Sequence, residues 1–151
     1  MTSHDSYDLA VMQAQPPDAL AAALEIVGDR WSLLVVAALL DGPRRFGDLL
    51  QGVPGIAPNV LSGRLRALGQ SAVVVARPYS ERPPRFIYEL TDGGRELAGP
   101  LHLLSAWGAR NSAEPHSPLH SACGTPLQTR WWCPTCEEAI ADGEGEELQF
   151  A

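Results

Sequence analysis

The central third of the chain, residues 42–91, reads GPRRFGDLLQGVPGIAPNVLSGRLRALGQSAVVVARPYSERPPRFIYELT. It holds an amphipathic segment, Pro58–Leu68, followed by two runs rich in β-branched and aromatic residues, Val73–Tyr79 and Phe86–Leu90. The first segment has apolar residues at helical spacing, and the other two have the composition of paired strands. The sequence therefore predicts a helix that leads directly into a β-hairpin.

The helix predicted over Pro58–Leu68 has two chemically different sides. Proline suits its first turn, where a missing N–H costs nothing. One side is apolar and comprises Ile56, Leu61, Leu65 and Leu68. The other is small or hydrogen-bonding and comprises Asn59, Ser62, Gly63 and Arg66. Short polar groups with an arginine suit a DNA major groove, although periodicity alone describes a solvated helix face equally well.

A shorter helix is predicted just upstream, over Phe46–Gln51, with Arg44 and Arg45 immediately before it. The cluster Gly52–Gly55 contains two glycines and a proline, which end the helix in a turn. Two helices joined by a short turn and followed by a hairpin form a winged helix-turn-helix, a fold that binds duplex DNA.

The hairpin loop is predicted over Ser80–Arg85. Two prolines stiffen it, and Arg82 and Arg85 flank them. A stiff loop with arginines suits contact with the DNA backbone or the minor groove. An ordinary hairpin with solvated charges is the alternative.

Two helices are predicted before this region. Asp18 can cap the first, Ala19–Val27, and Gly28 ends it. The second, Arg30–Leu40, is apolar almost all round, so we expect it to be buried on most sides. Trp31 is expected to anchor the core.

A long helix is predicted after the hairpin, from Thr91 to about Arg110, with Pro100 kinking or restarting it. Its apolar stripe is wider than one small domain needs. Together with the Ala-rich first helix, it favours a homodimer surface, the alternative being packing within one chain. A small apolar effector between the dimer helices is compatible with this arrangement, but nothing in the sequence specifies one.

All three cysteines lie near the C-terminus. The segments are His120-Ser-Ala-Cys123 and Cys133-Pro-Thr-Cys136. Three cysteines and one histidine form a standard tetrahedral zinc set, and a site closed by four protein ligands is structural. A tail this short also lacks a core of its own. His116 could replace His120, and a Cys-x-x-Cys pair in an intracellular protein can instead be a redox pair.

Charge is distributed unevenly along the chain of 151 residues, whose net charge is −7. Residues 18–111 hold nine acidic side chains and ten arginines, whereas residues 112–151 hold seven acidic side chains and one arginine. Phosphate binding depends on local arginine placement rather than on the total, so the balance argues only against a histone-like polycation.

The predicted fold class is mainly α with a small β-wing, plus a small zinc-ribbon-like extension. We expect a flexible arm at residues 1–17, the winged helix-turn-helix at 18–111, a linker at 112–118 and the zinc-ribbon-like tail at 119–151. The chain has no apolar run long enough for a membrane span, and Met1–Gln15 lacks the features of a signal peptide, so a cytoplasmic protein is expected. No catalytic constellation is present, so we predict that it is not an enzyme.

Four motifs resemble the HxlR-type winged-helix transcription regulators, which are relatives of the MarR group. They read LEIVGDRW (24–31), DGPRRF (41–46), VLSGRLR (60–66) and PPRFIYELT (83–91), in the order and spacing of that family. The resemblance runs from about Asp18 to Gly108. It implies a dimeric DNA-binding regulator.

The chain departs from the family pattern at several positions. Asp18 stands where many members carry a sensing cysteine, which excludes thiol sensing at that helix. Gly63 interrupts the predicted DNA-reading helix, where glycine costs about 0.5–1 kcal/mol relative to alanine. Ala72 replaces a glycine at the turn into the wing and is strained if that turn needs a positive φ. Val75 and Ala76 replace a charged pair.

These observations lead to one main hypothesis and two alternatives. The first is a transcription regulator that binds a palindromic operator as a homodimer, with the helix at 58–68 in the major groove and residues 80–85 on the backbone or minor groove. Arg64 is ambiguous, because it lies beside the apolar face and could pair with an acid. The alternatives are a metal- or redox-responsive switch with the tail as sensor, and a protein-interaction module that has lost DNA binding. The predicted DNA-contacting residues are Arg44, Arg45, Pro58, Asn59, Ser62, Arg64, Arg66, Arg82 and Arg85.

Overall fold

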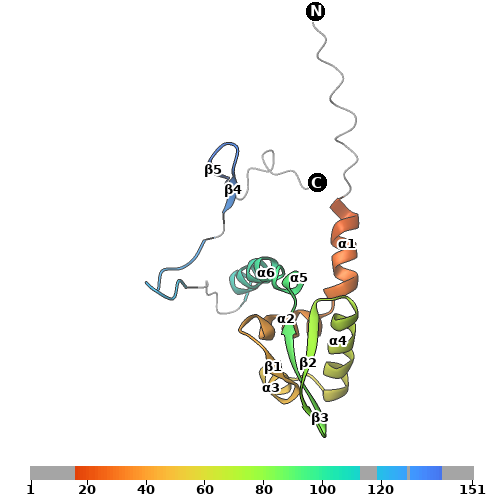
Figure 1. Ribbon diagram of the computed structural model, residues 1–151. Helices are drawn as coiled ribbons and strands as arrows, with labels where there is room; N and C mark the ends of the chain where they lie inside the picture. The colour runs from red at the N-terminus through yellow and green to blue at the C-terminus, as the bar shows by residue number, and fades with distance from the viewer. Residues whose placement is uncertain (1–15, 113–118, 129, 141–151) are drawn as a thin grey trace, which may run out of the picture. The chain divides into compact units, whose positions relative to one another are not determined.

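The computed structural model describes residues 16–112, 119–128 and 130–140. They fall into two compact units, one from Ala23 to Leu127 and the other formed by the described residues before Ala23 and after Leu127. The elements, labelled in Figure 1, are α1 (Pro16–Val27), α2 (Arg30–Leu40), β1 (Arg44–Arg45), α3 (Phe46–Gly52), α4 (Pro58–Gln70), β2 (Val74–Glu81), β3 (Pro84–Leu90), α5 (Asp92–Arg95), α6 (Ala98–Arg110), β4 (Trp131–Cys133) and β5 (Glu138–Ile140). The mainly helical fold with a small wing is confirmed.

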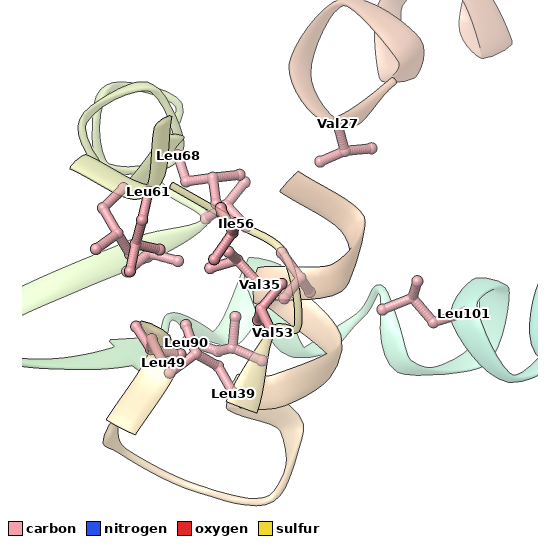
Figure 2. Close-up of a cluster of buried hydrophobic side chains, with 14 residues drawn as sticks. Val27, Val35, Leu39, Leu49, Val53, Ile56, Leu61, Leu68, Leu90 and Leu101 are labelled. Atoms are coloured by element: carbon pink, nitrogen blue, oxygen red, sulfur yellow. The ribbon is translucent and has the colours of Figure 1, made fainter. Parts of the chain in front are cut away.

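The hydrophobic core of the larger unit forms between α2 and α4. Helix α2 contributes Val35, Val36 and Leu39. Helix α4 contributes one row at helical spacing, of which Figure 2 labels Leu61 and Leu68. That row is Leu61, Leu65 and Leu68, the apolar face expected from the sequence. Burying one such side chain stabilises the fold by about 1.5–3 kcal/mol. The side of α4 that points away from α2 is consequently fixed.

The start of α4 also depends on local sequence. Pro58 occupies its first turn, as predicted. The same core buries Ile56, just before the N-cap, and Leu61, the fourth residue of the helix. This arrangement fixes the angle at which the chain enters a helix. Helix α4 continues two residues beyond its predicted end and runs unbroken through Gly63, beside which the structure leaves open space.

The turn from α4 into the wing contains a strained residue. The Val73 N–H donates to the Leu68 carbonyl at 2.9 Å, and the Ala72 N–H donates to the Gly69 carbonyl at 3.2 Å. This pattern is a Schellman motif, whose penultimate residue is left-handed and usually glycine. Ala72 occupies that position with a φ of +54°. The expectation of strain there is confirmed.

The wing is a three-stranded antiparallel sheet in the order β1-β3-β2. Its hairpin strands are longer than predicted, because residues 80, 81, 84 and 85 are paired across them. The predicted six-residue loop is therefore wrong, and only Arg82 and Pro83, joined by a cis peptide bond, separate the strands. The Ser80 hydroxyl donates to the Pro83 carbonyl at 3.0 Å and closes this tip.

The C-terminal helical segment is broken earlier than expected. The Thr91 hydroxyl caps α5 by accepting the Gly94 N–H at 3.0 Å, and it donates to the Ala72 carbonyl at 2.6 Å. A Cβ at Gly94 would lie 2.2 Å from the Val73 carbonyl oxygen, so glycine is required at this close approach. The break falls after Arg95, and Pro100 lies in the first turn of α6, where its missing N–H is not needed.

One expectation about the N-terminal helices needs correction. Helix α1 begins at Pro16 rather than after Asp18, consistent with the preference of proline for first helical turns. Helix α2 has its predicted bounds, and from Trp31 to Leu40 every residue except Leu34 is buried or half-buried, so the expected burial on most sides is confirmed. Trp31 packs against the core, as expected.

Replacing Ala72 with glycine should stabilise the protein. Relief of the left-handed strain outweighs the extra entropy that glycine gives the unfolded chain, for a net gain of about 0.5–1 kcal/mol. Urea unfolding followed by circular dichroism would measure it.

Ala67→Gly provides the matched control, because the same substitution then falls inside α4. It should destabilise the protein by about 1 kcal/mol. Equal losses for both variants would show that Ala72 carries no strain.

Candidate nucleic-acid interface

The side of α4 opposite the core carries the polar residues predicted for DNA contact. Pro58, Asn59, Ser62 and Arg66 are all exposed, and Gly63 lies among them. Within the described parts of the chain, Arg66 makes no ion pair. The helix thus presents short hydrogen-bonding groups and an arginine to solvent, which matches what a major groove requires.

Arg64 has a structural partner. Its guanidinium lies 3.2 Å from Asp29, the residue that caps the N-terminus of α2. The same carboxylate accepts the N–H groups of Trp31 and Ser32, each at 3.0 Å. Arg64 therefore ties α4 to the start of α2. The alternative raised from the sequence, that it pairs with an acid, is confirmed, and this contact uses one nitrogen of its guanidinium.

The environment of Asp29 favours its charged form. Burial by itself would raise the pKa of this carboxyl, but hydrogen bonds with Ser32 and Trp31 and the Arg64 charge together lower the pKa below its ordinary value.

The two arginines before α3 play different roles. The Arg44 Nε donates to the Ala38 carbonyl at 2.7 Å, and its guanidinium pairs with Asp41 at 3.2 Å. These contacts hold Arg44 against the end of α2. Arg45 is exposed, and its guanidinium carbon lies 4.7 Å from the centre of the Tyr79 ring. Of this pair, Arg45 is exposed and Arg44 is half-buried.

The tip of the hairpin carries the remaining predicted arginines. Arg82 and Arg85 are exposed, and neither makes an ion pair with any residue that the structure describes. Arg77, further along β2, pairs instead with Glu89 on β3. The hairpin also exposes two aromatic rings, Tyr79 and Phe86, which are not among the contacts predicted from the sequence. In the sequence both lie in runs typical of ordinary strands, so nothing there singled them out.

The cysteine tail contains two turns of similar geometry. After His120-x-x-Cys123, the Gly124 N–H donates to the His120 carbonyl at 2.7 Å. After Cys133-x-x-Cys136, the Glu137 N–H donates to the Cys133 carbonyl at 2.9 Å. Gly124 and Glu137 both have positive φ, +70° and +56°. Each Cys-containing turn is therefore closed in the same way.

Local contacts distinguish the thiols. The His120 Nδ1 lies 3.2 Å from the Cys123 sulfur. Backbone N–H groups of Cys136 and Thr135 lower the pKa of the Cys133 thiol. Among the residues that the structure describes, no group of three or more metal-ligating side chains occurs. His116, the alternative ligand, lies outside them.

Residues 26–116 match the protein family described as HxlR-like helix-turn-helix. This is most of the winged helix-turn-helix unit. The chain belongs to that family. It is a helix-turn-helix transcriptional regulator and, like its relatives, not an enzyme.

Individual relatives support the assignment to the HxlR-like family. An uncharacterized HTH-type transcriptional regulator of Mycobacterium tuberculosis is 37% identical over 127 residues, covering 82% of this chain and 80% of the relative. A putative transcription factor from Pseudomonas aeruginosa has a similar structure, with a TM-score of 0.67, 29% identity and coverage of 87% of this chain and 90% of that one. The redox regulator HypR in its oxidized form gives a TM-score of 0.58 at 28% identity, covering 62% and 97%.

This HxlR-like protein has no described helix that is long and apolar enough to cross a membrane.

Two substitutions of Asp29 should distinguish the stability contributed by its helix cap from that contributed by its ion pair. Asp29→Ala removes both and should cost about 0.5–2 kcal/mol. Asp29→Asn retains a good cap and loses only the partly exposed pair with Arg64, so it should cost at most about 1 kcal/mol. Urea unfolding at neutral pH would measure both.

The parent and Asp29→Asn should become equally stable in acid. Because the folded pKa of Asp29 is lowered, its contribution is complete above the unfolded pKa of about 3.9 and is lost as the pH falls through the folded value. A difference in unfolding free energy that persists unchanged at low pH would contradict this role.

Proposed function

We propose that this regulator binds a palindromic operator as a homodimer, with α4 in the major groove and the β2–β3 hairpin on the backbone or minor groove. One observation carries the proposal: the apolar row of α4 is buried while its opposite side exposes Asn59, Ser62 and Arg66. The hairpin after α4 adds Arg82 and Arg85, also exposed. A double helix supplies base edges for the first set and phosphates for the second.

Exposed apolar rows on α1 and α6 support the dimer. On α1, Leu20 is 62% exposed and Leu24 is 52% exposed. On α6, Leu104 is 50% exposed and Trp107 is 59% exposed. Large apolar side chains exposed along a helix favour burial against a second copy. A two-fold dimer presents two recognition helices about one helical turn of DNA apart, which suits a palindrome.

The proposed partner also implies a cellular location. A regulator that binds the chromosome works in the cytoplasm of a prokaryotic cell.

Charge reversal at either Arg66 or Arg85 should abolish binding to DNA. Arg66→Glu and Arg85→Glu each replace an attraction to phosphate or base with a repulsion. A gel shift on the duplex upstream of the protein's own gene would measure this.

Light scattering on the same sample without DNA should give twice the mass of one chain, as expected for a homodimer.

Arg95→Glu is the matched control, since it changes net charge equally but lies on α5, beyond the end of β3 opposite the hairpin tip. It should leave the retarded band in place. If Arg66→Glu and Arg85→Glu bind as well as the parent, the assigned contact face is wrong. If the parent shifts no fragment even at low salt, the alternative of a protein-interaction module is favoured.

We also propose that His120, Cys123, Cys133 and Cys136 bind a structural zinc ion. The support is the donor chemistry of the four side chains and the shared closure of the two turns, in which a left-handed residue comes directly after the second donor. Zinc would hold together a segment that lacks a hydrophobic core of its own.

Purified protein should contain about one zinc ion per chain by elemental analysis. Cys133→Ser and Cys136→Ser should lose the metal, because a hydroxyl does not replace a thiolate ligand. Thr135→Ala changes the same turn without removing a donor and should retain it. Metal-free parent protein that also fails to take up added zinc would refute the proposal.

A metal- or redox-responsive switch is the second candidate function. The observations that favour it are the exposed thiols and the similarity to HypR, which is named a redox regulator. Chelator or peroxide should then change operator affinity in the gel shift, since a chelator removes the zinc ion and peroxide oxidises the thiolates that bind it. Unchanged affinity after both treatments would leave the tail with a structural role only.

A further inference from the structure

Strand β1 divides its two arginines between the two faces of the wing. Successive strand residues point to opposite faces, and Arg44 donates to Ala38 on α2. Arg45 therefore projects from the face directed away from α2. Its backbone is held in place, because it pairs with Ile87 on β3 and its N–H donates to the Asp48 carboxylate at 3.1 Å.

The side chain of Arg45 lies across the sheet. Strand β3 separates β1 from β2, yet the Arg45 guanidinium carbon is 4.7 Å from the ring centre of Tyr79 on β2. A guanidinium at this distance is attracted by the aromatic ring. The other arginine in the same cross-strand row, Arg77, pairs with Glu89 and does not compete for the ring.

A β-bulge sets the direction of Tyr79. The pairing of β2 with β3 passes from Pro78↔Phe86 to Ser80↔Arg85, so Tyr79 is the extra residue without a partner in the ladder. Bulges redirect the side chain that they contain. Tyr79 remains 44% exposed, so packing in the core does not account for the position of its ring.

We propose that Tyr79 is a positioning residue that holds the Arg45 guanidinium over the outer face of the wing for contact with a DNA phosphate. This inference rests on the proposed function. A guanidinium stacked on a ring keeps its N–H edge free for bidentate binding of phosphate oxygens. Holding it in place reduces the conformational entropy lost when DNA binds.

The test compares four variants on the duplex upstream of the protein's own gene, with the dissociation constant measured by fluorescence anisotropy over a series of salt concentrations. Tyr79→Leu should raise that constant about 2–5-fold, the value of an exposed cation–π contact. Tyr79→Phe retains the ring and should match the parent. Arg45→Gln should weaken binding and reduce the salt slope by about one.

The double variant Tyr79→Leu/Arg45→Gln decides between positioning and a purely structural role. If Tyr79 acts through Arg45, the double variant binds no more weakly than Arg45→Gln alone. An equal loss from Tyr79→Leu in both backgrounds, or no loss in either, would overturn the inference. A parent protein that does not bind the duplex at all would overturn the proposed function as well, so the two failures are distinguishable.

Discussion

Burial of Leu61, Leu65 and Leu68 against α2 is the contact on which the rest of the DNA-binding surface depends. Those side chains fix the rotation of α4 about its own axis. Because successive residues of a helix are separated by about 100° around its axis, a different buried row would turn Asn59 and Arg66 into the protein. The core thus determines the polar surface, and loss of packing at α2 would affect binding without any change to an exposed residue.

Polar contacts then connect the elements around this core. Asp29 caps α2 and holds Arg64 of α4, so one carboxylate serves both local helix formation and tertiary packing. Thr91 has the same double use, since it caps α5 and also donates to the carbonyl of Ala72 at the entry to the wing. The position of the hairpin relative to α4 is therefore fixed at the base of the wing, where β2 begins and β3 ends.

The helices and the hairpin could be predicted because their apolar spacing records local burial. The spacing of Leu61, Leu65 and Leu68 indicated both the helix and its buried face. The hairpin loop could not be placed correctly, since residues 80–85 are rich in proline and charge but are paired through backbone groups, which side-chain composition does not reveal. The partners of Arg44, Arg45 and Arg64 could not be identified in advance, because each is set by the tertiary fold, although pairing of Arg64 with an acid was among the alternatives.

Ala72 shows how a local rule and the global fold can disagree. The Schellman turn is held on its helix side by the bond from the Val73 N–H to the Leu68 carbonyl, and on its wing side by the Thr91 hydroxyl, which donates to the Ala72 carbonyl. The sequence alone predicted only that Ala72 would be strained if the turn required a positive φ. The structure shows that the turn does require it, because Ala72 has a φ of +54° held by contacts on both sides. Strain of this kind persists where the surrounding packing over-determines the backbone, and here that packing joins α4 to the wing.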